Sequence, residues 1–200
     1  MKTAHLFIDY QNLHLSAHDR FGTLGAAVHQ SLIHPGLFAT ALEKRRNELV
    51  YEAVRIEKVH VFRGMPSNQN ETVPASRNKA QKAEWTRDPR VVLYERPLRY
   101  PRAWPAEPAR EKGVDVMLAI TFIRAAMEKW ADYLILASRD TDLLPALEIA
   151  HTIDGAHVEV AGWHGDSRLS FSGVKGGPRL WGTRLEEAEF KASKDPRRYA

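Results

Sequence analysis

EKGVDVMLAITFIRAAMEKWADYLILASRDTD, residues 111–142, is the stretch that decides the fold. Apolar residues recur at helical spacing after Asp115, and a short apolar run from Tyr133 to Ser138 then ends directly before Asp140 and Asp142. We therefore predict a helix followed by a buried strand, with acidic side chains at both outer ends of the unit. Carboxylates at the ends of buried strands are costly unless a cation binds them, so the pattern favours a divalent metal site.

The predicted helix carries two apolar rows. One row consists of Leu118 and Phe122, and the other is made of four residues at helical spacing: Val116, Ile120, Ile123 and Met127. Because two rows cover more than one side of a helix, we expect this helix to be buried over much of its circumference.

The rest of the chain repeats the alternation of apolar runs and helical patterns. Strands are expected at residues 4–8, 54–62, 91–94, 133–138 and 158–161, with a short final one near 180–181. Helical patterns lie between them, at residues 37–50, 75–85 and 115–127 and again after residue 142. This order predicts an α/β fold with a mainly parallel central sheet and helices on both faces. We place a single domain in residues 1–185 and a charged C-terminal tail in residues 186–200.

Composition narrows the classes of function. The chain has 200 residues, a formal net charge of +4 and no cysteine, which excludes disulfides, thiolate zinc sites and cysteine nucleophiles. No apolar run approaches the roughly 18 residues that span a bilayer, and the N-terminal residues show no hydrophobic signal region. We expect a cytoplasmic protein with no membrane contact, and the assemblies that we consider include a homodimer.

Positive charge is concentrated between residues 77 and 112. The segment holds ten cationic residues and four interleaved aromatic ones: Arg77, Lys79, Lys82, Arg87, Arg90, Arg96, Arg99, Arg102, Arg110 and Lys112, with Trp85, Tyr94, Tyr100 and Trp104. This composition suits phosphate contacts with base stacking, but a solvated face over core aromatics explains it equally well. The prolines from Pro97 to Pro108 predict a long exposed loop around Arg99 and Arg102, of the kind that often holds substrate.

Four aspartates, Asp9, Asp115, Asp140 and Asp142, each follow a predicted strand or begin a predicted helix. In open α/β sheets, ligands bind at the carboxyl ends of the strands, so these side chains could converge. Two carboxylates about 5 Å apart repel by roughly 3 kcal/mol at an effective dielectric near 20, and a bound Mg²⁺ or Mn²⁺ would reverse that penalty. Asp9 taken alone could equally be a helix cap.

Three segments together resemble a known family. FIDYQNL at 7–13, KGVDVMLAITFIRAA at 112–126 and LILASRDTDLLPALEIA at 134–150 are similar, in order, to the signature blocks of the NYN domain, in its LabA/DUF88-like branch of the PIN-like nuclease superfamily. The resemblance implies a three-layer α/β/α sandwich of PIN-like type and a metal-dependent ribonuclease.

By position, the resemblance implies that four aspartates hold the metal and that an asparagine and a serine support them: Asp9, Asp115, Asp140 and Asp142, with Asn12 and Ser138. Lys112 and Arg139 would neutralise the RNA substrate at the site, and Arg99 and Arg102 would hold its flanking phosphates.

Two positions depart from the family pattern. Thr121 stands where members commonly carry a second aspartate, six residues after Asp115, and Arg139 replaces a glycine. The loss of one carboxylate could weaken metal binding, or Thr121 could be an ordinary helix residue in a site that needs only the other four acids. Arg139 could contact the scissile phosphate or could pair with Asp140.

The leading hypothesis is an endoribonuclease that hydrolyses RNA phosphodiester bonds with Mg²⁺ or Mn²⁺. The alternative is a catalytically weakened RNA-binding or adaptor module of the same fold, because of Thr121. A phosphatase acting on small phosphate esters is less favoured, since the segment Asp9-Tyr10-Gln11 lacks the second aspartate of a DxD motif.

Overall fold

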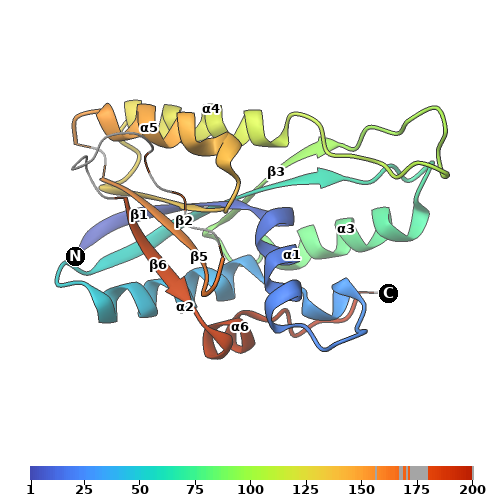
Figure 1. Ribbon diagram of the computed structural model, residues 1–200, viewed down its shortest axis with the longest axis horizontal. Helices are drawn as coiled ribbons and strands as arrows, with labels where there is room; N and C mark the ends of the chain where they lie inside the picture. Colours follow the sequence, from blue (N-terminus) through green and yellow to red (C-terminus); the bar gives the residue numbers. More distant parts are fainter. Residues whose placement is uncertain (156, 167–168, 170, 172–179, 200) are drawn as a thin grey trace.

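The computed structural model describes residues 1–155, 157–166, 169, 171 and 180–199. Within them, six strands form one parallel sheet in the order β3-β2-β1-β4-β5-β6 (Figure 1). The strands are β1 (Lys2–Asp9), β2 (Val54–Met65), β3 (Val91–Pro97), β4 (Tyr133–Ala137), β5 (His157–Trp163) and β6 (Trp181–Leu185). The predicted α/β fold with a parallel sheet is confirmed.

Helices cover both faces of the sheet, which makes three layers (Figure 1). Helices α4 and α5 lie on one face, and α1, α2, α3 and α6 lie on the other. Their bounds are α1 (Tyr10–Phe21), α2 (Pro35–Leu49), α3 (Thr72–Trp85), α4 (Val114–Met127), α5 (Leu144–Thr152) and α6 (Glu187–Ser193), with short 3₁₀ turns η1 (Val28–Ser31) and η2 (Thr141–Leu143). The α/β/α sandwich expected from the resemblance is therefore present.

The strand order reverses beside β1. From β1 the chain adds β2 and then β3 on one side, and it returns through α4 to add β4, β5 and β6 on the other side. The carboxyl ends of β1 and β4 are therefore adjacent, with Ile8 in register with Ala137. Such a reversal leaves a crevice at the ends of the two central strands, and this is where open α/β sheets bind ligands.

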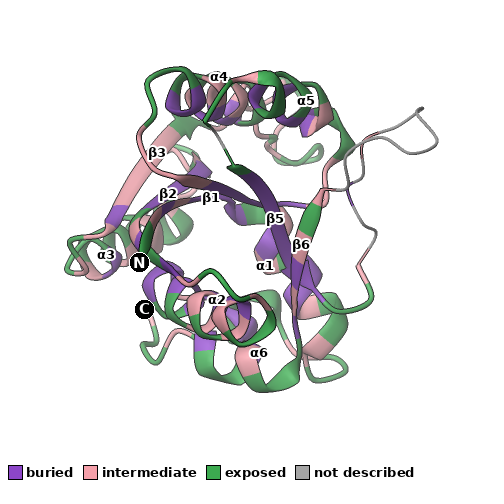
Figure 2. Cartoon of the chain, turned by 90° about the vertical axis from the view of Figure 1, so that its left-hand side faces the viewer, coloured by how far each residue is buried: buried purple, intermediate pink, exposed green. Residues whose placement is uncertain are grey.

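The outer side of α4 departs from the expectation of burial. Leu118 and Phe122 are buried, and the ring of Phe122 meets Phe7 of β1 edge-on. Val116 and Ile120, by contrast, are 61% and 63% exposed. The expectation was wrong because α4 is a surface helix with one face on the sheet, so its second apolar row faces solvent (Figure 2).

The interleaved aromatics do not form one stacking surface. Trp85 is fully buried, and its indole N–H donates to Asp195 at 2.7 Å. Tyr94 stacks on Phe62 beneath α4. For Trp85 the core interpretation is therefore the right one, because a buried ring cannot stack on a base.

The proline-rich segment forms an arm, residues 98–110, that projects past the ends of β2 and β3 (Figure 1). Arg99 and Arg110 exchange two backbone hydrogen bonds across it, at 2.8 and 3.0 Å. The Tyr100 hydroxyl accepts a hydrogen bond from the backbone N–H of Ser67 and donates one to Glu71. The arm is thus anchored on the segment that leads into α3.

The last described residues pack against the domain. Phe190 of α6 is buried with the core residues that α2 also contacts. The division into a domain ending at residue 185 and a charged tail stays a prediction. Among the described residues, no helix combines the length and apolar character needed to cross a membrane.

Candidate functional site

Asp9 is the buried acid at the centre of the site. It ends β1 and caps the N-terminus of α1, where its Oδ1 accepts a hydrogen bond from the backbone N–H of Asn12 at 3.3 Å. Its Oδ2 accepts a hydrogen bond from the hydroxyl of Ser138 at 2.9 Å. Only 4% of Asp9 is exposed, so its carboxylate is held by the protein rather than by solvent.

The turn after β4 is joined to the turn after β1. The Ser138 hydroxyl accepts a hydrogen bond from the N–H of Asp140 at 3.0 Å, and the side-chain oxygen of Asn12 accepts one from the N–H of Arg139 at 3.1 Å. Asp140 caps η2 by accepting from the N–H of Asp142 at 2.9 Å. These contacts fix the direction in which the Asp140 carboxylate points.

Asp115 approaches from the opposite layer, in the first turn of α4. Gly113, directly before the helix, has a φ of +76°, which a residue with a side chain rarely adopts. The turn brings the Asp115 carboxylate to the strand ends, where one oxygen each of Asp9, Asp115 and Asp140 lie within 4.8 Å of one another. We call these three residues the acidic triad.

The triad is electrostatically strained. The pKa of Asp9 is raised to about 6, chiefly by burial and in smaller part by the charges of Asp115 and Glu111, while the hydrogen bonds from Ser138 and Asn12 act in the opposite direction. Partial burial and the charges of Asp140 and Asp142 also raise the pKa of Asp115. Asp9 and Asp115 therefore ionise less readily than free carboxyl groups.

The donor set fits a hard divalent cation. Three carboxylates supply oxygen ligands only, which suits Mg²⁺ or Mn²⁺ and not a thiolate-seeking metal. They border a concave space of about 240 Å³ that Gln11, Asn12, Leu15 and Arg139 complete. A cation bound there would remove the repulsion that raises the pKa values of Asp9 and Asp115.

The other residues expected at the site lie around the triad. Asp142 is outside the group of three converging carboxylates, although its charge acts on Asp115. Arg139 lies 3.7 Å from Asp166, so the ion pair considered with Asp140 is replaced by one with a residue after β5. Lys112 is exposed and lies with Glu111 in the lining of a cavity beside the arm, and Arg99 and Arg102 are exposed on the arm.

Thr121 does not join the carboxylates. Its hydroxyl donates to the carbonyl of Met117, one turn earlier in α4, at 2.7 Å. The side chain is therefore hydrogen-bonded within its own helix.

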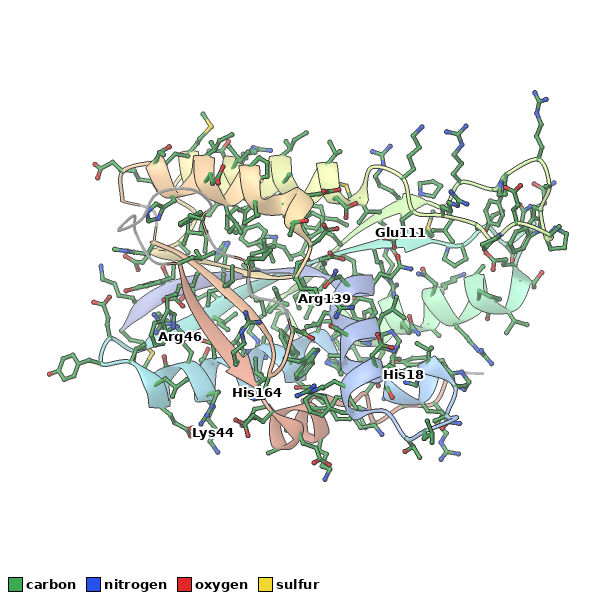
Figure 3. The ribbon with its side chains drawn as sticks, in the orientation of Figure 1. His18, Lys44, Arg46, Glu111, Arg139 and His164 are labelled. Atoms are coloured by element: carbon green, nitrogen blue, oxygen red, sulfur yellow. The ribbon has the colours of Figure 1, made fainter. Side chains whose placement is uncertain are left out.

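Glu111 is a fourth acid that sequence reasoning missed as a site residue. It accepts a hydrogen bond from the backbone N–H of Gly64 in β2, and its charge contributes to the raised pKa of Asp9. Burial and the charge of Asp115 raise the pKa of Glu111. In Figure 3, Glu111 and Arg139 are labelled at the end of the sheet where β1 passes into α1. The only sequence signal was its place before Lys112 and Gly113, and the partner Gly64 is distant in the chain.

Comparison with known proteins shows the family to which the chain belongs. A search of curated proteins finds no significant match. Among solved structures, the chain is similar to a crystal structure of a protein of unknown function from Vibrio parahaemolyticus, with a TM-score of 0.52 and 14% identity over 84% of this chain and 85% of that one. At this identity the likeness concerns the fold. The family model of the NYN domain matches residues 3–172, a range that includes the turns after β1 and β4 and the helix α4. The chain therefore belongs to the NYN domain family.

Proposed function

We propose that the chain is a metal-dependent endoribonuclease whose acidic triad holds Mg²⁺ or Mn²⁺. The observation that carries the proposal is the convergence of Asp9, Asp115 and Asp140 within 4.8 Å at the point where the strand order reverses. NYN domains are generally nucleases, and three carboxylates that repel one another at a crevice suit a cation that acts on a phosphodiester.

The chain's own residues supply position and charge. Asp9 is preorganised by Ser138 and by the N-terminus of α1, and Asp140 by the N–H of Asp142. When bound, a divalent cation would supply a water of lowered pKa and would offset the charge of the scissile phosphate. In this proposal Asp142 tunes the triad through its backbone and its charge, and Asn12 holds the two turns together.

The substrate strand would enter beside the arm. A cavity of about 300 Å³ lies along the arm and the two residues that follow it, lined by Arg99, Pro101, Glu107, Arg110, Glu111 and Lys112. Glu111 thus borders this cavity, and its charge also raises the pKa of Asp9 in the triad. We assign flanking phosphates to Arg99, Arg102 and Lys112, and we assign Arg139, whose side chain is 40% exposed, to the phosphate at the triad.

The test is cleavage of a labelled single-stranded RNA with Mn²⁺, with Mg²⁺ and with EDTA. We expect cleavage only with metal, and a loss of about a hundredfold or more in Asp140→Asn, because the variant keeps the hydrogen-bond acceptor and loses the charge. The matched control is Asp154→Asn, an exposed aspartate after α5, which should cleave like the wild type. Intact RNA with both metals would count against the nuclease.

A second candidate is a catalytically weakened RNA-binding or adaptor module. The observation that favours it is the Thr121 hydroxyl, which is engaged with Met117 where the family pattern has a carboxylate. Its signature is RNA retained on a filter without cleavage, together with calorimetry that detects no Mn²⁺ binding. Activity gained in Thr121→Asp would identify this substitution as the cause, whereas failure of both proteins would end the nuclease proposal. Cytoplasmic location and homodimer formation stay predictions.

A further inference from the structure

A second large concavity lies away from the triad, around the C-terminal segment. It measures about 550 Å³, and we call it the terminal basic cavity. Three parts of the chain line it: His29, Gln30 and Leu32 in and directly after η1, Arg77 and Gln81 of α3, and residues 194–199 after α6.

The lining has an excess of positive charge. Four cations face one carboxylate: Arg77, Lys194, Arg197 and Arg198 against Asp195. Arg197 pairs with Glu84 at 2.7 Å. Among the residues that the structure describes, Arg77, Lys194 and Arg198 take part in no ion pair. Three cations without counter-charges in one concavity repel one another, and an anion would relieve that repulsion.

Asp195 is already engaged by the protein. Its Oδ2 accepts hydrogen bonds from the Trp85 indole at 2.7 Å and from the Tyr199 hydroxyl at 2.8 Å, and its Oδ1 accepts one from the N–H of Arg197 at 2.9 Å. The carboxylate therefore shapes the wall of the cavity and is not free to pair with the unpaired cations.

Arg77 carries an unmet hydrogen bond. Its Nε is buried and has no partner among the described residues. A buried guanidinium N–H without an acceptor is unfavourable, so an acceptor in the cavity toward which the Arg77 side chain turns would relieve that cost. A phosphate oxygen is a matching acceptor for a guanidinium group.

The cavity is preorganised. The terminal segment pairs with the chain before α2: His34 N–H donates to the carbonyl of Ser193 at 2.9 Å, and Asp195 N–H donates to the carbonyl of Leu32 at 2.8 Å. The cations at its end are thus presented from a fixed backbone, which lowers the entropic cost of binding an anion.

Tyr10, which follows Asp9 directly, contacts two residues next to the cavity lining: Ile33, which follows Leu32, and Trp85, which donates to Asp195. Its hydroxyl donates to the carbonyl of Ile33 at 2.8 Å, and its ring lies 4.8 Å from the ring of Trp85. Figures 1 and 2 place α3 and the C-terminus together, and Figure 1 shows them on the side of the molecule where β2 and β3 finish.

We propose that the terminal basic cavity binds phosphate groups of the RNA strand on which the triad acts, and so forms a second anchoring site. The inference rests on the proposed function for the identity of the strand. Phosphate groups of a free nucleotide share the same chemistry, and the experiment separates the two sources.

The experiment measures the affinity for a fluorescent single-stranded RNA of about 12 nucleotides by anisotropy, in EDTA so that no cleavage occurs. We expect Arg77→Ala/Arg198→Ala to bind about tenfold more weakly. We also expect the slope of log affinity against log salt to fall by about 1.4, because each lost single-strand phosphate contact contributes about 0.7. Arg198→Ala alone, at an exposed residue that the fold does not need, should show about half of this change in slope.

The matched control is Arg55→Ala, which removes one exposed cation at the amino end of β2 and should bind RNA like the wild type. Wild-type affinity and salt slope in the double variant would overturn the inference. So would binding of AMP that depends on Arg77 and Arg198 while RNA binding does not, since the ligand would then be a free nucleotide.

Failure of the inference and failure of the proposed function can be told apart. If the protein binds RNA through Arg77 and Arg198 but never cleaves it, the cavity inference holds and the nuclease proposal fails. If the protein cleaves RNA with metal but its double variant binds RNA normally, the nuclease proposal holds and the cavity inference fails.

Discussion

At the scale of single residues, the site depends on one hydroxyl. Ser138 donates to Asp9 and accepts from the N–H of Asp140, so it couples the two acids that end the central strands. It is buried, and water cannot readily replace it.

Ser138→Ala should therefore affect stability and metal binding together. It leaves an oxygen of Asp9 and the N–H of Asp140 without their partner, so we expect a loss of about 1–3 kcal/mol in the free energy of unfolding. Mn²⁺ affinity should fall as well, since the direction of both carboxylates is loosened. Urea denaturation and calorimetry measure the two effects, and Ser76→Ala, at an exposed serine of α3, is the control. Unchanged values for Ser138→Ala would show that the backbone alone positions the acids.

Metal binding should depend on pH because of Asp9. Burial raises the pKa of Asp9 to about 6, so below that pH a proton occupies the carboxylate that the cation needs. Mn²⁺ affinity should then rise with pH, by about tenfold for each unit below 6, and level off above it. Calorimetric titrations at about pH 5 and about pH 7.5 test the sign, because competition with a proton can only weaken binding on the acid side. A constant affinity across this range would exclude Asp9 as a ligand.

At the scale of elements, β2 and the segment before α4 meet at Gly64 and Glu111. A Cβ on Gly64 would lie 2.4 Å from Cδ2 of Leu98 and 2.8 Å from the Oε1 of Glu111. Because Gly64 has no side chain, Glu111 can reach its backbone N–H, and Leu98 at the start of the arm can pack beside it.

Gly64→Ala should displace Glu111 and the start of the arm. The added methyl cannot fit without movement, so we expect about 1–3 kcal/mol of destabilisation and weaker RNA binding at the arm. Gly182→Ala in β6 is a matched control, because its Cβ would meet Val160 at 3.1 Å and needs a far smaller shift. Denaturation and anisotropy measure both effects. If Gly64→Ala binds RNA as tightly as Gly182→Ala does, the arm does not contact the substrate.

At the scale of the whole molecule, the sequence predicts what depends on local order. The strand ends at Asp9 and Asp140 and the helix start at Asp115 follow from apolar runs and capping signals, and parallel strands then bring them to one edge. Periodicity could not tell which apolar row of α4 faces the sheet, since Val116 and Leu118 are equally apolar.

Contacts between segments that are distant in the chain could not be predicted from the sequence. The pairs Gly64 with Glu111 and Arg139 with Asp166 depend on which loops the sheet brings together. The same is true of Trp85, whose indole N–H donates to Asp195, 110 positions later. The pattern of apolar and polar residues within a short window of sequence carries no information on such distant partners.

The state of the triad should control the stability of the entire fold. Without a cation, the repulsion among its acids opposes folding, so Mn²⁺ at a hundredfold excess over its Kd should raise the free energy of unfolding by about 2.7 kcal/mol. Asp140→Asn keeps the acceptor that caps η2 and removes one charge, so in EDTA it should be at least as stable as the wild type and should gain nothing from Mn²⁺. Asp132→Asn, which loses an ion pair with Lys2 at the opposite end of the sheet, should be less stable but should keep the full metal increment. Urea denaturation with and without Mn²⁺ compares the three proteins. An equal increment in Asp140→Asn would place the cation elsewhere, because binding to the folded state stabilises only through the residues that hold the ion.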